Sequence, residues 1–102
     1  MARLVVLYKT PKDPAAFDAY YFKSHVPLAK KLPGLRRYEV SRGAVASPAG
    51  PSGIHLVATL HFDDLAAVGA AFASPEGKAA AADVGTFASG GVNMYFYESG
   101  DV

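Results

Sequence analysis

The order of segments along this chain predicts an α+β sandwich of the ferredoxin-like type, βαββαβ, with a four-stranded antiparallel sheet. Three observations predict it. Segments with the two-residue alternation of strands occur at both ends and in the middle, segments with apolar residues three and four apart separate them, and proline and glycine clusters mark the boundaries. Two split βαβ halves in this order place the helices on one face of the sheet. At 102 residues we expect a single domain, 1–102.

The first strand is predicted over Arg3 to Lys9, which is β-branched and aromatic. Asp13 followed by Pro14 is typical of a helix N-cap with proline at the first helical position. The first helix should run from about Pro14 towards Lys31 and end at Leu32-Pro33-Gly34. The side chains on one side of this helix are Phe17, Tyr20, Tyr21, Ser24, Leu28 and Leu32.

Two further strands are predicted in the middle of the chain. Leu35 to Arg42 alternates as a strand, and Ile54 to Phe62 alternates over its whole length. Between them, Gly43 to Gly53 is rich in glycine and proline, and is either a surface loop or a flap over a pocket. His55 and His61 share one face of the third strand, and we expect that face to be solvated or covered by a partner.

The last third of the chain predicts a broken helix and a final strand. Asp63-Asp64 caps a helix whose apolar face holds Leu65, Val68 and Phe72. Ser74-Pro75 starts a second helical segment, which should run from Glu76 to about Val84 and end at Gly85. In the closing strand, Gly91 to Glu98, one face carries Val92, Met94 and Phe96, and the other carries Asn93, Tyr95 and Tyr97.

The composition excludes several classes of function. The chain has 10 basic and 9 acidic residues and a net charge of +1, so no overall field favours nucleic acid or an anionic membrane as a partner. It has no cysteine, which excludes disulfides, thiolate ligands and cysteine nucleophiles. No segment approaches the roughly 20 apolar residues of a membrane helix. The N-terminal apolar run is too short for a signal peptide, and we expect a cytoplasmic protein.

The distribution of apolar residues predicts a homodimer. The first and last strands carry apolar or aromatic residues on both faces, although helices can cover only one face of such a sheet. The uncovered face therefore needs a partner. Two copies of the chain packed sheet against sheet would bury this face in one symmetric interface. A hydrophobic fraction of 51% agrees with this expectation.

The candidate site is His25, at the edge of the aromatic side of the first helix and one turn after Tyr21. An ordinary histidine titrates near pH 6.5, so this imidazole can act as a general acid or base at neutral pH. Tyr20 or Tyr21 could orient it or donate to a developing oxyanion. The alternative is a histidine at the helix rim, bonded to a nearby carbonyl and without function.

Pro27 is expected to disturb the backbone beside this histidine. It lacks the amide that would bond to the carbonyl of Lys23, and it should push Val26 out of helical geometry. Free carbonyls would then lie next to the imidazole.

Other catalytic and metal-binding arrangements are not expected. His55 and His61 lie six residues apart, roughly 20 Å along a strand, so they cannot share one ion, and we expect no metal site. The chain has no Gly-x-Ser-x-Gly elbow and no glycine-rich phosphate loop. Ser24 does not face His25, because adjacent helical positions point apart.

The chain resembles the EthD family, named for a role in ethyl tert-butyl ether degradation. The resemblance spans nearly the whole chain, and its most specific element is His-x-Pro-Leu followed by Pro-Gly. The matching residues are Leu7-Tyr8-Lys9, Pro14, Phe17, Tyr20-Tyr21, His25-Val26-Pro27-Leu28, Leu32-Pro33-Gly34-Leu35, Ser74-Pro75-Glu76-Gly77, Ala82-Asp83-Val84 and Phe87.

This resemblance implies a dimeric α+β barrel linked to the degradation of small organic molecules. The superfamily includes cofactor-free monooxygenases, muconolactone-type isomerases, polyketide cyclases and haem-binding members, and His25 matches the pocket histidine of similar proteins. Three functions stay open. They are a cofactor-free oxidoreductase or isomerase/cyclase with His25 as general acid/base, a non-catalytic protein accessory to a separate oxygenase, and a haem protein with His25 as axial ligand. For the enzyme we expect no cofactor, His25, Tyr21 and Tyr20 as catalytic residues, and a small-molecule substrate contacted by Phe17, Tyr8, Leu28, Leu32 and Tyr95.

Overall fold

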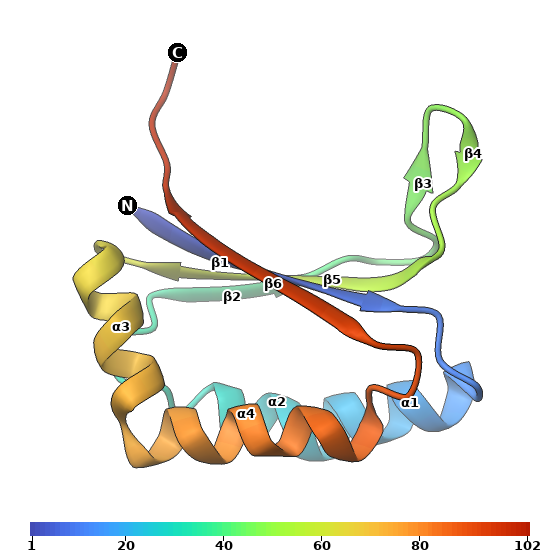
Figure 1. Ribbon diagram of the computed structural model, residues 1–102, viewed down its shortest axis with the longest axis horizontal. Coiled ribbons are helices and arrows are strands. Elements are labelled where there is room, and N and C mark those ends of the chain that lie inside the picture. Colours follow the sequence, from blue (N-terminus) through green and yellow to red (C-terminus); the bar gives the residue numbers. More distant parts are fainter.

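A four-stranded antiparallel sheet with all helices on one face forms the protein, which a computed structural model describes over residues 1–102 (Figure 1). The strand order is β2-β5-β1-β6. This arrangement confirms the ferredoxin-like fold expected from the order of segments. The strands are β1 (Ala2–Lys9), β2 (Arg37–Val40), β5 (Ile54–Phe62) and β6 (Val92–Glu98).

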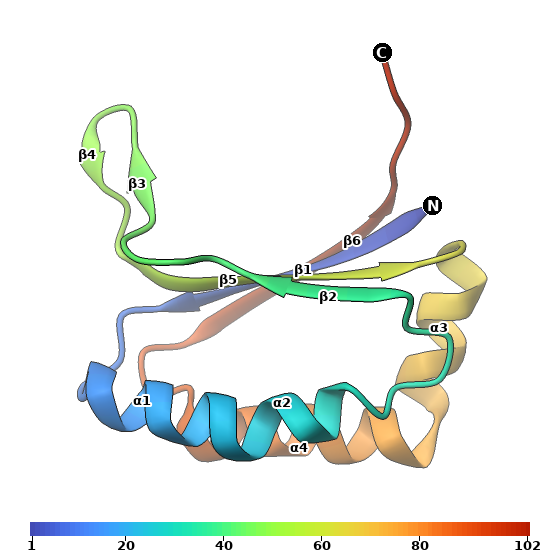
Figure 2. The ribbon, with the colours of Figure 1, turned by 180° about the vertical axis from the view of Figure 1, so that it is seen from behind.

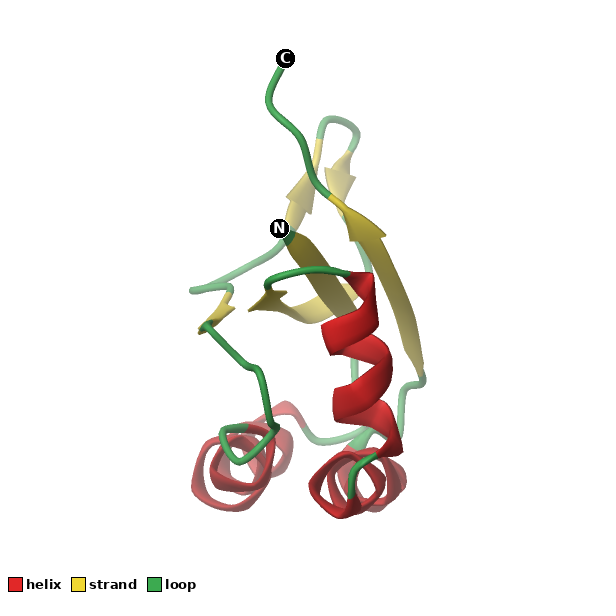
Figure 3. Cartoon of the chain, turned by 90° about the vertical axis from the view of Figure 1, so that its left-hand side faces the viewer, coloured by secondary structure: helices red, strands yellow, loops and turns green.

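Two helical rods lie side by side beneath this sheet, as the end-on view shows (Figure 3). The first consists of α1 (Pro14–Tyr20), a π-helical turn η1 (Tyr21–His25) and α2 (Val26–Ala29). The second is α4 (Pro75–Phe87), and α3 (Leu65–Ala73) stands at one end and connects it to the sheet (Figure 2). None of these helices is both long and apolar enough to cross a membrane.

The predicted helix caps are confirmed. The side chain of Asp13 accepts a hydrogen bond from the amide of Ala16, that of Asp64 from Ala67, and that of Ser74 from Gly77. The end of the last helix differs from the prediction. Helix α4 continues past Gly85 to Phe87, because Phe87 buries its ring in the core and holds this last turn in helical form.

The loop predicted over residues 43–53 contains a small hairpin formed by β3 (Ala46–Ser47) and β4 (Gly50–Pro51). Its strands are too short to show an alternating pattern, so no sequence pattern predicts them. The hairpin projects from the side of the sheet opposite the helices (Figure 1). It therefore does not cover the cavity described below, which lies on the helical side.

The faces of the strands follow the predicted alternation, with one exception. Partner pairs such as Leu4↔Leu60 and Val6↔Ala58 point their side chains at the helices. Between Tyr8↔Leu56 and Lys9↔Ile54 the register shifts, which leaves His55 as an extra residue in a β-bulge.

This bulge re-aims the side chain of His55, and the expectation that His55 lies on the outer face is wrong. Its Nε2 lies 2.7 Å from the carboxylate of Asp18, and its ring is edge-on to that of Phe17, with the ring centroids 5.0 Å apart. Asp18 and Phe17 both belong to α1, so His55 points towards the helices. His61 keeps the predicted outer face, where its ring contacts Arg3 and its Nε2 lies 2.7 Å from Glu39.

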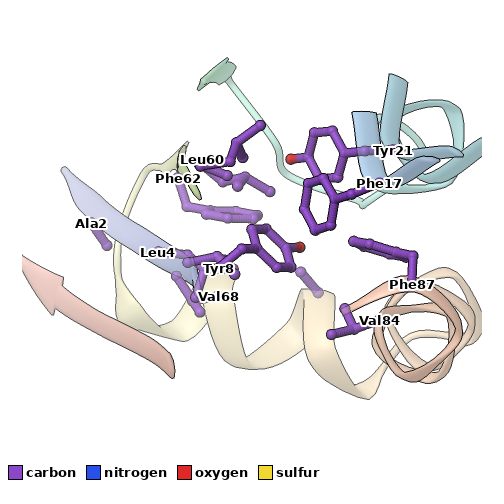
Figure 4. Packing of buried hydrophobic residues seen from close by; sticks show 14 residues of the cluster. Ala2, Leu4, Tyr8, Phe17, Tyr21, Leu60, Phe62, Val68, Val84 and Phe87 are labelled. Carbon is purple, nitrogen blue, oxygen red and sulfur yellow. The ribbon is translucent and has the colours of Figure 1, made fainter. Parts of the chain in front are cut away.

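The core between the sheet and the helices is rich in aromatic rings (Figure 4). Tyr8 of β1 lies 5.4–5.5 Å from the rings of Phe17, Tyr21 and Phe87. Aromatic pairs at such separations contribute about 0.5–1.5 kcal/mol each beyond their buried area. The cluster therefore fixes the first helical rod, β1 and the end of α4 relative to one another.

Candidate functional site

The first helical rod accommodates Pro27 through a π turn rather than a break. The amide of Val26 bonds to the carbonyl of Tyr21, five residues back, and Val26 has helical angles of φ −56° and ψ −45°. The expectation that Val26 leaves helical geometry is therefore wrong. The wider turn brings His25 closer to the same face as Tyr21, with ring centroids 5.4 Å apart, so His25 is buried rather than at the rim.

The imidazole of His25 is paired with a carboxylate from the other helical rod. Its Nδ1 lies 2.9 Å from Oδ2 of Asp83, and the side chains of both residues are almost fully enclosed. The hydroxyl of Tyr20 donates to the other carboxylate oxygen, Oδ1, at 2.6 Å. Asp83 thus bonds to two residues that lie about 60 positions earlier in the sequence. The packing of the two helical rods brings Asp83 and His25 together.

The electrostatics of Asp83 determine which nitrogen of His25 carries the proton. Burial raises the pKa of Asp83, but the hydrogen bonds from Tyr20 and His25 and the attraction of His25 together hold that pKa below its ordinary value. An ionised carboxylate only accepts hydrogen bonds, so Nδ1 of His25 must be the donor. In the neutral ring, Nε2 then carries the lone pair and can accept a proton.

An apolar cavity of about 50 Å³ lies between the sheet and the helices, and His25 lines it. Of the 19 lining residues 17 are hydrophobic, tyrosines included, and no lysine or arginine is among them. Three lining residues carry hydroxyl groups: Tyr8, Tyr21 and Tyr38. The hydroxyls of Tyr21 and Tyr38 are hydrogen-bonded to each other at 2.5 Å. Burial raises the pKa of all three phenols, which keeps them neutral.

The structure brings some of the predicted site residues together at this cavity and leaves others away from it. His25, Tyr21, Tyr8 and Leu32 line the cavity. Tyr20 lies behind His25, bonded to Asp83. The remaining residues do not line the cavity: Phe17 packs against the rings of Tyr8 and Tyr21, Leu28 is half-buried on α2, and Tyr95 is exposed on the outer face of the sheet.

Sequence reasoning missed two residues of the site, Asp83 and Tyr38. Asp83 is the one acidic residue in the second half of the alanine-rich helix, three positions after Ala80 and four before Phe87, at the edge of the buried stripe. A lone carboxylate there is the signal that could have found it. Tyr38 falls on the inward face of the predicted second strand, so the alternation alone places it near the cavity.

Each histidine of the chain is paired with a different carboxylate: His25 with Asp83, His55 with Asp18 and His61 with Glu39. No three or more histidine or acidic side chains gather in a way that could hold a metal ion. The three pairs also differ in exposure. The carboxylates of Asp18 and Glu39 are about half exposed, whereas that of Asp83 is 11% exposed.

The fold and this site define a class of protein: a ferredoxin-like α+β domain with an apolar cavity and a carboxylate-oriented histidine between sheet and helices. Within that class, the chain belongs to the EthD family. The model of the EthD domain matches residues 9–91.

Comparisons with individual proteins agree with this assignment. An uncharacterised 11.0 kDa protein of Rhodococcus erythropolis, from the thcB-thcC intergenic region, is 45% identical over 96 residues, which cover 94% of this chain and 92% of that protein. The crystal structure of an EthD family protein from Bacillus halodurans superposes with a TM-score of 0.88 at 38% identity, covering 97% of this chain and 98% of that one.

Two more distant solved structures share the fold. SnoaB of Streptomyces nogalater, described as a cofactor-independent oxygenase, has a TM-score of 0.67 at 17% identity, with 99% of this chain and 94% of that chain covered. A dimeric protein with a ferredoxin-like fold from Bacteroides fragilis has a TM-score of 0.66 at 20% identity, with 96% and 95% covered.

Proposed function

We propose that this protein is a cofactor-independent acid–base catalyst acting on a small organic molecule in degradative metabolism, with His25 as the general acid/base. One observation carries the proposal: Asp83 holds Nδ1 of a buried imidazole whose ring lines an apolar cavity. Such a pairing fixes both the orientation and the tautomer of the catalytic ring. Membership of the EthD family and the likeness to a cofactor-independent oxygenase support chemistry of this kind.

The neighbouring tyrosines have distinct roles in this proposal. Tyr20 is a positioning residue, since its hydroxyl is bonded to Asp83. Tyr21 packs against the His25 ring and, through Tyr38, fixes one wall of the cavity. Leu32 and Tyr8 also line the cavity, where a bound molecule would contact them.

The test is replacement of His25 by asparagine, a smaller polar side chain that cannot accept a proton at neutral pH. A panel of small ketones, lactones and phenols is incubated with the protein, and conversion is followed by NMR. We expect the wild type to convert at least one compound and His25→Asn to be slower by about 100-fold or more, because general acid–base catalysis contributes 10²–10⁴-fold. Circular dichroism checks that the variant is folded. Conversion at an unchanged rate would remove His25 from the mechanism.

A second candidate is a non-catalytic binding protein that assists a separate enzyme. The lining of the cavity favours it, because most of the lining residues are hydrophobic and His25 is the only histidine, with no acidic residue among them. Binding of a compound by the wild type without any conversion, and equal binding by His25→Asn, would support this candidate instead. A haem protein fits less well, because the propionates of haem are anionic and no lysine or arginine lines the cavity.

We also propose that the protein forms a homodimer through the outer face of the sheet. Tyr95 and Tyr97 of β6 are 59% and 45% exposed there, beside the half-buried Val5 and Leu7 of β1. The β3–β4 hairpin and the C-terminal segment rise from opposite ends of the same face (Figure 2). The Bacteroides protein of the same fold is described as dimeric, which supports the proposal.

Charges placed on this face are expected to separate the two copies. The double substitution Tyr95→Lys and Tyr97→Lys should lower the mass measured by light scattering from that of two chains to that of one, because a buried unpaired charge costs several kcal/mol. Phe22→Lys is the matched control, since Phe22 is 51% exposed on the helical side and should not affect the mass. A wild-type mass of one chain would contradict the proposal.

A further inference from the structure

The hydrogen bonds of the tyrosines around the cavity leave one hydroxyl without a protein partner. The hydroxyl of Tyr20 is bonded to Asp83, and those of Tyr21 and Tyr38 are bonded to each other. Tyr8 is only 2% exposed, yet its hydroxyl makes no hydrogen bond to the protein. Buried hydroxyls without a partner are rare, because losing water without a replacement costs about 1–3 kcal/mol.

The Tyr8 hydroxyl borders the cavity rather than packed protein atoms. No side-chain nitrogen or oxygen that is wholly enclosed by protein lacks a partner, so this hydroxyl must face open space, and Tyr8 lines the cavity. Nε2 of His25 is in the same situation, since only Nδ1 is bonded to protein. A hydrogen-bond donor and a proton acceptor are therefore both available to a molecule in the cavity.

The side chains of Tyr8 and His25 share two aromatic neighbours. The rings of Tyr8 and His25 both contact Phe87, with centroids 5.5 and 4.7 Å from it, and both contact Tyr21, at 5.5 and 5.4 Å. One aromatic ring, that of Phe87 or that of Tyr21, therefore connects Tyr8 to His25 on either side. Figure 4 shows the Tyr8 ring extending from β1 towards Phe17 and Phe87, with its hydroxyl at the end nearer the helices.

The charges around the cavity favour an uncharged ligand. No lysine or arginine lines it, and the carboxylate of Asp83 lies directly behind His25. A carboxylate or phosphate in the cavity would lose its hydration without meeting a cation. Burial raises the pKa of Tyr8, so its hydroxyl remains a neutral donor.

We propose that the cavity takes an uncharged carbonyl compound, whose oxygen accepts a hydrogen bond from Tyr8 and whose α-C–H faces Nε2 of His25. The proposal rests on the proposed function and specifies its substrate class. In the reaction, Nε2 takes the α-proton. The C–H bond breaks, an N–H bond forms, and the electron pair moves to the carbonyl oxygen, where the Tyr8 hydroxyl stabilises the enolate. Return of the proton from His25 to the α-carbon exchanges the hydrogen there, and its return to the γ-carbon of a compound with a β,γ double bond completes an isomerisation without an oxidant.

The binding test compares three five-carbon-ring probes: cyclopentanone, cyclopentane and cyclopentanecarboxylate. NMR titration of the side chains lining the cavity measures their affinities for the wild type, Tyr8→Phe and the control Tyr97→Phe, which removes a hydroxyl on the outer face. We expect cyclopentanone to bind better than cyclopentane, and the carboxylate not to bind. Tyr8→Phe should weaken cyclopentanone about tenfold, as loss of one hydrogen bond does, and leave cyclopentane unchanged. Unchanged cyclopentane affinity also shows that the variant cavity is intact.

The chemical test follows deuterium incorporation into cyclopentanone in D₂O. If the ketone binds through Tyr8 but neither the wild type nor His25→Asn exchanges its α-protons faster than buffer, the inference about the ligand stands and the catalytic function fails. If Tyr8→Phe binds cyclopentanone as well as the wild type, or if ketone and hydrocarbon bind equally, the inference is overturned. In that case, a His25-dependent conversion of another compound would still support the proposed function.

Discussion

Replacement of Gly77 by alanine is expected to destabilise the fold by about 3 kcal/mol, at the upper end of the usual cost of overpacking. Gly77 is buried in the first turn of α4, where this helix turns back sharply from α3. A Cβ at this position would lie 1.9 Å from the carbonyl oxygen of Ala71 and 2.8 Å from its carbon. These are backbone atoms and cannot rotate away, so the two helices would have to separate.

Thermal denaturation measures this effect. For a domain of this size, 3 kcal/mol corresponds to a fall in Tm of roughly 12 °C or more. Gly85→Ala is the matched control, because Gly85 lies in the same helix and its added Cβ would meet nothing within 4 Å. Alanine there should raise stability by about 0.5–1 kcal/mol through its better helix propensity. If both substitutions stabilised the protein equally, the close approach of α3 and α4 would not restrict the size of the side chain at position 77.

Replacement of Asp83 by asparagine is expected to lower the rate of any His25-dependent conversion by about 10²–10⁴-fold, the range of general acid–base catalysis. Asparagine keeps the size of the side chain but can donate as well as accept. Its amide can donate to Nδ1 of His25, which places the ring proton on Nε2 and removes the lone pair from the cavity. The effect acts through His25, so Asp83 is a positioning residue.

The tautomer of His25 distinguishes this role from a purely structural one. The ¹⁵N chemical shifts of the imidazole should report a proton on Nδ1 in the wild type and on Nε2 in Asp83→Asn. The control Asp63→Asn also removes a carboxylate, but that of Asp63 is exposed and paired with Arg36, and it should change neither the shifts nor the rate. If Asp83→Asn had the wild-type rate of conversion although the ring proton of His25 had moved to Nε2, the positioning role of Asp83 would be contradicted.

The alternation of side chains predicted most of the fold because each strand has one buried and one outer face. It failed at His55, where the strand contains an extra residue, since an alternation assumes an uninterrupted strand. It also missed the β3–β4 hairpin, whose strands of two residues are too short to carry a period.

The candidate site was only partly predictable. The sequence indicated His25 through its place beside the aromatic side of the helix, but an ideal helical period put it at the rim. The π turn made it buried, and although Pro27 signals a disturbance of the backbone at this point, it does not tell a widened turn from a break. Asp83 could not be paired with His25 from sequence, because 58 residues separate them and only the packing of α4 against the first helical rod brings them together.

The extra residue held in the π turn makes this site sensitive to chain length as well as to side-chain chemistry. Loss of one residue between Tyr21 and Pro27 would allow an ordinary helix to form there. Side chains before and after the turn would keep their faces, because the π turn absorbs one extra residue, whereas those within the turn would change theirs. His25 lies in this turn, so its imidazole would shift relative to the carboxylate of Asp83 although every reactive group was retained. A single codon gained or lost in this segment is therefore a route by which an ordinary helix of this fold could acquire or abandon its reactive centre.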